Sequence, residues 1–228
     1  MKTGPNSVTP HFWALRNVTF DVAHGEVVGI MGRNGSGKTT LLRILSRIIC
    51  PTEGQVEITG RVGTVLDMGA GFHGELSGRE NIFLNGAVLG MSKTEIVRNF
   101  DAIVAFAELE PFLETPLKRF STGMCVRLAF AVASHTESDI LLVDEVLSAA
   151  DDSFRTRCLH KVLAAAQEGR TVIMVSHDLD FIRQFCTRGI VFERGRMLCD
   201  ASAFDAVEYS IARHSLPDRN EIRVAETV

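Results

Sequence analysis

The sequence has no long apolar run, no closely paired cysteines and no excess of positive charge. No apolar run approaches the roughly 20 residues that a membrane-spanning helix needs, so work at a membrane would require a partner that holds the chain there. Residues 1–10 lack an apolar core, and we therefore expect no signal peptide. The net charge of −4 argues against a protein held on nucleic acid by a broad basic face.

The cysteines and the overall composition predict a compact cytosolic protein. The five cysteines are scattered, odd in number and free of any Cys-x-x-Cys pair, which is typical of reduced thiols in the cytosol. Apolar residues make up 46% of the 228 residues and charged residues 23%, so the chain can bury a full core. This length fits one large domain or one domain with an inserted subdomain, and no internal repeat is visible.

Short apolar runs alternate with helical patterns along most of the chain, which predicts an α/β fold with a largely parallel sheet. Residues 18–22 alternate apolar and polar side chains, and residues 140–143 are continuously apolar, as in a strand buried on both faces. The predicted strands are residues 18–22, 26–31, 55–58, 63–66, 140–143, 172–175, 189–192 and 196–199, the last two forming a hairpin around Gly195. The predicted helices are residues 39–49, 124–133, 153–167 and 179–186.

The middle of the chain is helical and reads as an inserted subdomain, at about residues 69–133. Ser92 with Glu95 three residues later predicts a helix start with a capping box. We expect an α/β core with a small antiparallel β subdomain over residues 1–205, followed by a tail over residues 206–228.

A glycine-rich segment reads Gly32-Arg33-Asn34-Gly35-Ser36-Gly37-Lys38-Thr39 and is followed by Thr40. It matches the G-x-x-x-x-G-K-[ST] pattern at every fixed position and lies between a predicted strand and a predicted helix, which predicts that the α/β core is a P-loop nucleoside triphosphatase core. Glycines let backbone amides turn inward around phosphate oxygens, and the following helix points its positive end at the anion. Lys38 is expected to reach the outer phosphates, and the Thr39 hydroxyl to bind Mg²⁺.

Two further groups follow buried strands at the same edge of the predicted sheet. Asp144 and Glu145 end the apolar run 140–143, where Asp144 can bind Mg²⁺ with its water shell and Glu145 can act as general base on an attacking water. His177 follows the strand 172–175 and could contact the γ-phosphate or orient that water.

The order and spacing of these residues resemble the ATP-binding-cassette ATPases over about residues 14–199. Lys38 precedes Asp144 by 106 residues, Ser121 precedes it by 23, and His177 follows it by 33. The segment 120–124, Phe-Ser-Thr-Gly-Met, resembles the family's LSGGQ signature, and residues 148–151 resemble its D-loop. The resemblance implies a dimer with two composite sites, in which Ser121 and Gly123 contact the ATP held by the opposite subunit. It also implies that Asp151 binds ATP as part of a D-loop that passes between the subunits.

The sequence departs from the family pattern at three places. The signature lacks its second glycine and its glutamine, and Asp67 stands where a glutamine is usual after the strand 63–66. Asp67 can still meet Mg²⁺ or its waters. The family's adenine-stacking aromatic has no clear match: Phe12 or Trp13 could take this role, or both could pack against the sheet.

Three longer stretches resemble one subgroup, the ATPase subunits of bacterial polysaccharide exporters; they are residues 66–82, 120–133 and 141–154. The resemblance is to the short type without a carbohydrate-binding domain. It implies a homodimer that binds ATP and Mg²⁺ and drives a separate transmembrane permease through the helical subdomain and residues 67–77. It also implies a peripheral location at the cytoplasmic face of the inner membrane and no nucleic-acid partner. Two alternatives remain: a soluble cassette ATPase that is not coupled to transport, and a degenerate nucleotide-binding subunit.

Overall fold

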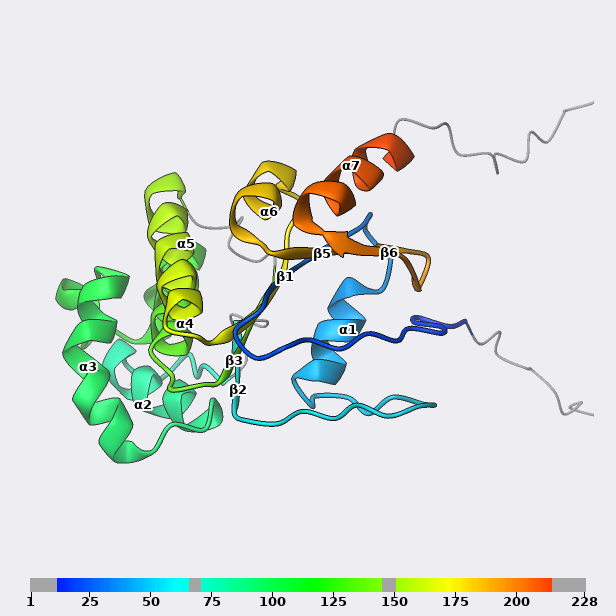
Figure 1. Cartoon of the computed structure of the whole chain (residues 1–228). Coiled ribbons are helices and arrows are strands. Elements are labelled where there is room, and N and C mark those ends of the chain that lie inside the picture. The colour runs from blue at the N-terminus through cyan, green and yellow to red at the C-terminus, as the bar shows by residue number, and fades with distance from the viewer. Residues whose placement is uncertain (1–11, 66–70, 145–150, 215–228) are drawn as a thin grey trace, which may run out of the picture.

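The computed structural model describes residues 12–65, 71–144 and 151–214. Its centre is a six-stranded sheet in the order β2-β3-β4-β1-β5-β6. The strands are β1 (Val27–Met31), β2 (Val62–Val65), β3 (Ile140–Val143), β4 (Thr171–Val175), β5 (Arg188–Glu193) and β6 (Arg196–Ser202). All neighbouring strands run parallel except the β5–β6 hairpin, which forms one edge of the sheet (Figure 1).

Helices cover both faces of the sheet because alternate strand residues point to opposite sides. On one face, Leu41 and Leu42 of α1 (Lys38–Leu45) join a core with Val28, Ile30 and Leu142. On the other face, strand residues such as Leu141 and Val143 pack with α4 (Thr122–Ser134), α5 (Asp152–Gln167), α6 (Leu179–Phe185) and α7 (Ala203–His214).

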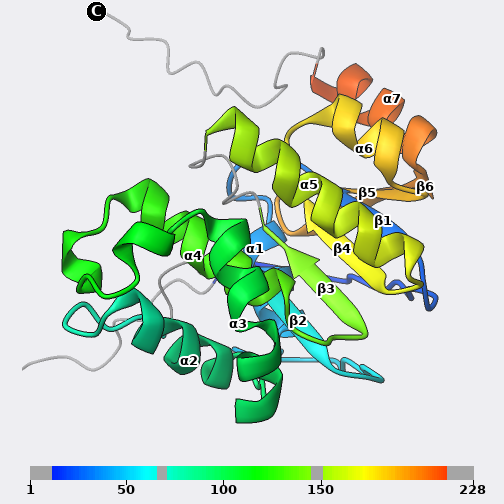
Figure 2. The ribbon, with the colours of Figure 1, turned by 90° about the vertical axis from the view of Figure 1, so that its left-hand side faces the viewer.

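A helical layer lies beside the β2–β3 end of the sheet, as Figure 2 shows. It contains α2 (Gly78–Val88), α3 (Lys93–Ala107), the short 3₁₀ turns Glu110–Phe112 and Leu117–Arg119, and α4, around their own apolar core. The predicted capping box at Ser92 and Glu95 is present at the start of α3. A second one, formed by Ser77 and Glu80, starts α2.

Two predicted strands are wrong, and several predicted ends of helices and strands differ from those in the structure. Residues 18–22 form no strand, although their apolar side chains Val18, Phe20 and Val22 pack against the core. Residues 55–58 also form no strand, and Val56 is exposed. Helix α1 ends at Leu45 instead of residue 49, because Arg47 takes a left-handed conformation (φ 59°) and Ile48 and Ile49 point into solvent. The hairpin strands are longer than predicted. Helix α7 spans the boundary expected after residue 205 and packs on β5 and β6.

Candidate active site

The phosphate loop leaves the buried strand β1 at Gly32 and enters α1 at Lys38, as predicted. Three of its glycines have positive φ, with 146° at Gly32, 78° at Gly35 and 105° at Gly37. Two of them lie against other backbone: a Cβ at Gly32 would lie 2.2 Å from the Phe192 carbonyl oxygen, and one at Gly37 would lie 2.6 Å from that of Ala14. Gly35 faces open space instead. The loop is therefore fixed on its inner side and open on its outer side.

Lys38 is buried, and its ammonium group donates hydrogen bonds to carbonyl oxygens of its own loop. The Nζ atom lies 2.6 Å from the oxygen of Gly32 and 3.1 Å from that of Arg33. These bonds hold a positive charge inside the curve of the loop. Binding of a phosphate is the role expected of Lys38 in such a loop, and this role stays a prediction.

The residues of the loop fit a phosphate group. The Ser36 hydroxyl is buried and has no hydrogen-bond partner among the described residues, which is costly for a buried polar atom. Gly37 is the N-cap of α1, so no side chain caps this helix start, and the first turn contains no acidic residue. The amides there are available to an anion, and the helix dipole favours one. Arg33, Asn34 and Thr39 are exposed at the mouth of the loop, and Thr40 is half-buried.

The turn of the β5–β6 hairpin is hydrogen-bonded to the phosphate loop, a contact that the sequence does not reveal. The Gly195 amide donates to the Ser36 carbonyl oxygen at 2.9 Å, and the Arg16 amide donates to the Gly195 carbonyl oxygen at 2.7 Å. A Cβ at Gly195 would lie 2.6 Å from the Ala14 carbonyl oxygen. Residues 14–16, the hairpin turn and the phosphate loop therefore form one packed unit.

The strand register brings the predicted acidic and histidine groups to the same edge as the loop. Val143 pairs with Met174, Val175 pairs with Ile30, and the Ser176 amide donates to the Ile30 carbonyl oxygen at 3.3 Å. Asp144, half-buried, and His177, exposed, thus follow two strands whose carboxyl ends meet the phosphate loop. With strands about 4.8 Å apart, Asp144 follows a strand about 10 Å from β1, a distance that a triphosphate with its metal can bridge.

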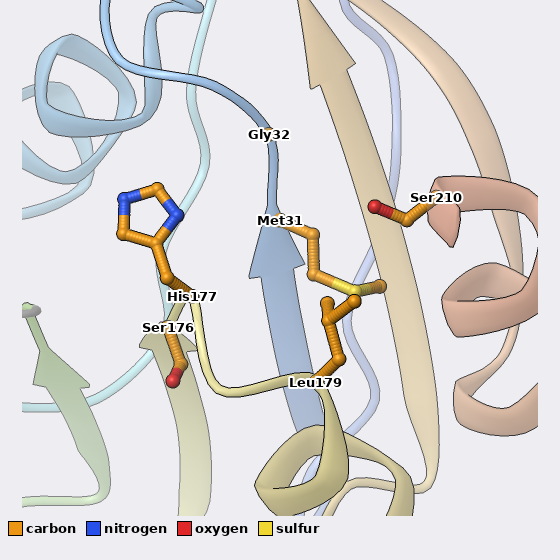
Figure 3. Close-up of a pocket in the computed structure, with 6 residues that line it drawn as sticks. All are labelled: Met31, Gly32, Ser176, His177, Leu179 and Ser210. Carbon is orange, nitrogen blue, oxygen red and sulfur yellow. The ribbon is translucent and has the colours of Figure 1, made fainter. Parts of the chain in front are cut away.

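His177 lines a pocket of about 180 Å³ beside the end of β1, together with Met31, Gly32, Ser176, Leu179 and Ser210. Figure 3 shows the imidazole ring on one side of this strand end, and the side chains of Met31 and Ser210 on the other. Ser210 belongs to α7, so the C-terminal helix contributes to the wall next to the phosphate loop. The predicted catalytic residue Glu145 and the predicted metal ligand Asp67 lie outside the described residues.

The Ser121 motif is carried by α4, on the opposite face of the sheet from α1. Ser121 is the exposed N-cap of this helix, and its hydroxyl accepts a hydrogen bond from the Met124 amide at 3.2 Å. Gly123 lies in the first turn. Asp151 is the N-cap of α5, accepts from the Phe154 amide at 3.0 Å and pairs with Arg127. Both its bonds are therefore made within the chain.

Phe12 and Trp13 do not bury their rings against the sheet: Phe12 is 87% exposed and Trp13 is 47% exposed. The packing alternative is therefore wrong for Phe12. Adenine stacking by either ring stays a prediction.

Two features are absent from the described ranges. No helix within them is long and apolar enough to cross a bilayer. They also contain no group of three or more His, Cys, Asp or Glu side chains that could hold a metal ion. A divalent ion bound near Thr39 and Asp144 would therefore need additional ligands, such as phosphate oxygens and water.

Fold and loop together define a P-loop cassette, in which a glycine-rich loop joins a buried parallel strand to a helix and acidic and histidine residues follow neighbouring strands. Residues 15–148 match the family model described as ABC transporter. The chain belongs to this ABC transporter family.

Two curated relatives and one solved structure show the likeness in detail. The "O-antigen export system ATP-binding protein RfbB" of Myxococcus xanthus is 45% identical over 173 residues, which cover 76% of this chain and 40% of that protein. The protein of the same name from Klebsiella pneumoniae is 39% identical over 197 residues, covering 86% and 80%. A dimeric ATP-binding cassette in a post-hydrolysis state, bound to ADP and Pi, superposes with a TM-score of 0.75 at 27% identity, covering 89% of this chain and 94% of that one. The chain spans about two fifths of the length of its Myxococcus relative.

Proposed function

We propose that this chain binds and hydrolyses ATP with Mg²⁺ and thereby powers export of a cell-surface polysaccharide through a separate transmembrane permease. Two copies act as a head-to-tail pair, peripheral to the membrane at the cytoplasmic face of the inner membrane and held there only by the permease. The observation that carries the proposal is the phosphate loop, with the buried Lys38 ammonium and the buried Ser36 hydroxyl at the carboxyl edge of the sheet. The names of the O-antigen export relatives support a polysaccharide as the exported substrate.

In this proposal the loop amides, Ser36 and Lys38 bind the β- and γ-phosphates. Lys38 has short carbonyl contacts within the loop, so its ammonium is already held where terminal phosphates would lie. Thr39, Asp144 and Asp67 would hold Mg²⁺, and the bound ion would neutralise charge on the phosphates. Glu145 takes the proton of the attacking water, a step that contributes about 10²–10⁴-fold in rate. His177 contacts the γ-phosphate or orients that water.

Ser121 and Gly123 of one chain complete the site of the other. Ser121 is exposed on the side of the sheet opposite α1, so it is presented to a second copy. The dimeric, product-bound cassette that resembles this chain supports the pairing. Closure of the pair moves the helical layer and residues 67–77 against the permease, a ligand-driven shift between two arrangements.

The decisive experiment is Glu145→Gln, which keeps the size of the side chain and removes its basicity. The variant should bind ATP and form a stable dimer in ATP and Mg²⁺, as measured by size-exclusion chromatography with light scattering, while ATP turnover falls at least 100-fold. Glu168→Gln, an exposed glutamate beyond the end of α5, is the matched control and should turn over normally. Unchanged turnover in Glu145→Gln removes Glu145 as the base.

Coupling to export needs a second measurement. The chain is co-expressed with candidate polysaccharide-export permeases, and polymer at the cell surface is quantified. Co-purification, ATPase stimulated by the polymer and loss of surface polymer in Lys38→Ala support export. A normal ATPase that binds no membrane protein and leaves surface polymer unchanged supports the soluble alternative.

A further inference from the structure

The turn between β5 and β6 consists of two residues, Arg194 and Gly195, because Glu193 pairs with Arg196 across it. Both turn residues have positive φ, 48° at Arg194 and 76° at Gly195. A two-residue hairpin turn of type I′ requires positive φ at both positions, and its twist matches that of the flanking strands. The backbone of Gly195 is therefore held at a fixed place just beyond the end of β5.

The buried residue Gly195 is held from two sides. Its amide donates a hydrogen bond to the Ser36 carbonyl oxygen at 2.9 Å, and its own carbonyl oxygen accepts one from the Arg16 amide at 2.7 Å. A Cβ added at Gly195 would lie 2.6 Å from the Ala14 carbonyl oxygen, and a Cβ added at Gly37 would lie 2.6 Å from the same atom. The turn and the phosphate loop therefore approach each other closely only because both positions are glycines.

The hydrogen bond from Gly195 fixes the direction of the next amide in the phosphate loop. Ser36 and Gly37 are joined by a trans peptide, whose planar geometry makes its C=O and N–H groups point in opposite directions. Because the Ser36 carbonyl oxygen faces the turn, the Gly37 N–H group points away from the turn. Within the described residues this amide donates to no backbone oxygen, and it lies at the start of α1, where the helix dipole favours an anion.

We propose that Gly195 is a positioning residue for phosphate binding, because its amide holds the Ser36–Gly37 peptide with the Gly37 N–H directed toward a phosphate oxygen. This inference rests on the proposed function and adds the β5–β6 turn to the residues that determine the affinity of the site. The turn contacts the loop, so its effect extends to every ligand that offers the same phosphates. Inorganic tripolyphosphate with Mg²⁺ is therefore a suitable probe, since it carries neither base nor sugar.

The test is Gly195→Ala, whose Cβ would push the turn away from Ala14 and the loop. The dissociation constants of ATP and of tripolyphosphate, measured by competition with a fluorescent ATP analogue, should both rise at least about tenfold, as expected for one hydrogen bond to a charged group. In chains labelled with ¹⁵N-glycine, saturating tripolyphosphate should shift the NMR signal of the Gly37 amide. This shift should be much smaller in the variant.

Gly60→Ala is the matched control. Gly60 has a φ of 106°, and an added Cβ would lie 2.9 Å from the Cβ of Asp139. It precedes β2, which two strands separate from β1 and the phosphate loop. The control should lose stability in urea unfolding while both dissociation constants stay within about twofold. If Gly195→Ala does not fold, a glycine inserted after Arg194 displaces the Gly195 amide within a three-residue hairpin loop, and the same losses of affinity are expected.

The inference is overturned if the folded variant binds tripolyphosphate with native affinity. Loss of affinity for ATP alone also overturns it, because the turn would then act on the rest of the nucleotide and not on the phosphate loop. Equal losses of affinity in Gly60→Ala would attribute the effect to lost stability. If the unmodified chain binds tripolyphosphate and ATP without hydrolysing ATP, the proposed function fails while this inference stands. Binding of neither ligand by the unmodified chain refutes both.

Discussion

The Lys38 ammonium lies 2.6 Å from the carbonyl oxygen of Gly32, the first residue of its own loop. Because Lys38 is buried, this contact satisfies a charge that is removed from water. The contact also keeps the ammonium inside the curve of the loop, where a phosphate would meet it with little rearrangement.

Lys38→Ala should weaken ATP binding by about 10- to 100-fold, since charge-assisted hydrogen bonds contribute about 1.5–3 kcal/mol. Equilibrium binding of a fluorescent ATP analogue measures this change. Lys93→Ala, at an exposed position at the start of α3, should bind normally. Full affinity in Lys38→Ala contradicts the assignment of the phosphate loop.

Gly37→Ala should lower the free energy of unfolding by more than backbone strain alone would. Its φ of 105° and the Ala14 carbonyl oxygen, 2.6 Å from the added Cβ, both oppose a side chain. Gly169→Ala is the control, because Gly169 has a φ of 87° but nothing within 4 Å of an added Cβ. We expect a loss of about 1 kcal/mol in the control and at least about 2 kcal/mol in Gly37→Ala, from urea unfolding. Equal losses of stability in the two variants would show that the backbone at Ala14 shifts to accommodate the added Cβ, and would contradict the prediction.

Ser121→Arg should abolish most ATP hydrolysis while the monomer still binds ATP. The new side chain would block the surface that the proposed pairing turns toward the second copy, and the loop of its own chain is untouched. The control is Ser92→Arg, which also removes the N-cap serine of a helix and costs about 1 kcal/mol of stability without loss of turnover. Normal hydrolysis by Ser121→Arg refutes the shared site.

Asn81→Ala should destabilise the helical layer by about 2 kcal/mol, the cost of unsatisfied buried polar groups. The fully buried Asn81 amide accepts from the His73 amide and donates to the carbonyl oxygens of His73, Leu76 and Ser77, so it holds the loop before α2. Hydrogen exchange of residues 73–77 should accelerate in the variant. Asn99→Ala on α3 makes the same chemical change as a control, and equal exchange in both variants would remove this role.

Cys186 makes stability depend on pH above neutrality. Burial raises the pKa of its thiol to about 12, against 9.0 in an unfolded chain. The folded state therefore holds this proton more tightly than the unfolded chain does. The contribution of Cys186 to the free energy of unfolding is complete below pH 9 and is lost as the pH rises toward 12. In Cys186→Ala the free energy of unfolding should fall less steeply between pH 9 and 11. An unchanged slope, measured by urea unfolding, contradicts this assignment.

The sequence predicts well those elements whose structure is determined by residues close together in the chain. Residues 140–143 are buried on both faces and follow a continuous apolar run, so β3 has its predicted bounds. The glycine-rich loop and the capping box at Ser92 are likewise determined within a few residues. Residues 18–22 show the limit of this reasoning, because alternation reports which side chains are buried and not whether the backbone pairs with another strand.

The parts of the site that could not be predicted depend on contacts between distant residues. Gly195 forms a backbone hydrogen bond with Ser36, and Arg127 forms an ion pair with Asp151. The residues of each pair lie far apart in the sequence, so no periodic pattern reveals these contacts. The D-loop motif predicts that Asp151 binds ATP. The structure adds its helix cap and its ion pair with Arg127. Glu145 and Asp67 stay predictions, since they lie outside the described residues.

The tight turn at Gly195 also has a practical consequence. By its glycine and its place between β5 and the edge strand β6, it resembles the exposed turns that usually accept epitope tags or fluorescent labels. Its amide and carbonyl are both engaged, one with the phosphate loop and one with the backbone at Arg16. A tag inserted here would disturb the phosphate loop and with it nucleotide binding. Tags and labels are better placed elsewhere, for example near Gly54, where an added Cβ would have no atom within 4 Å.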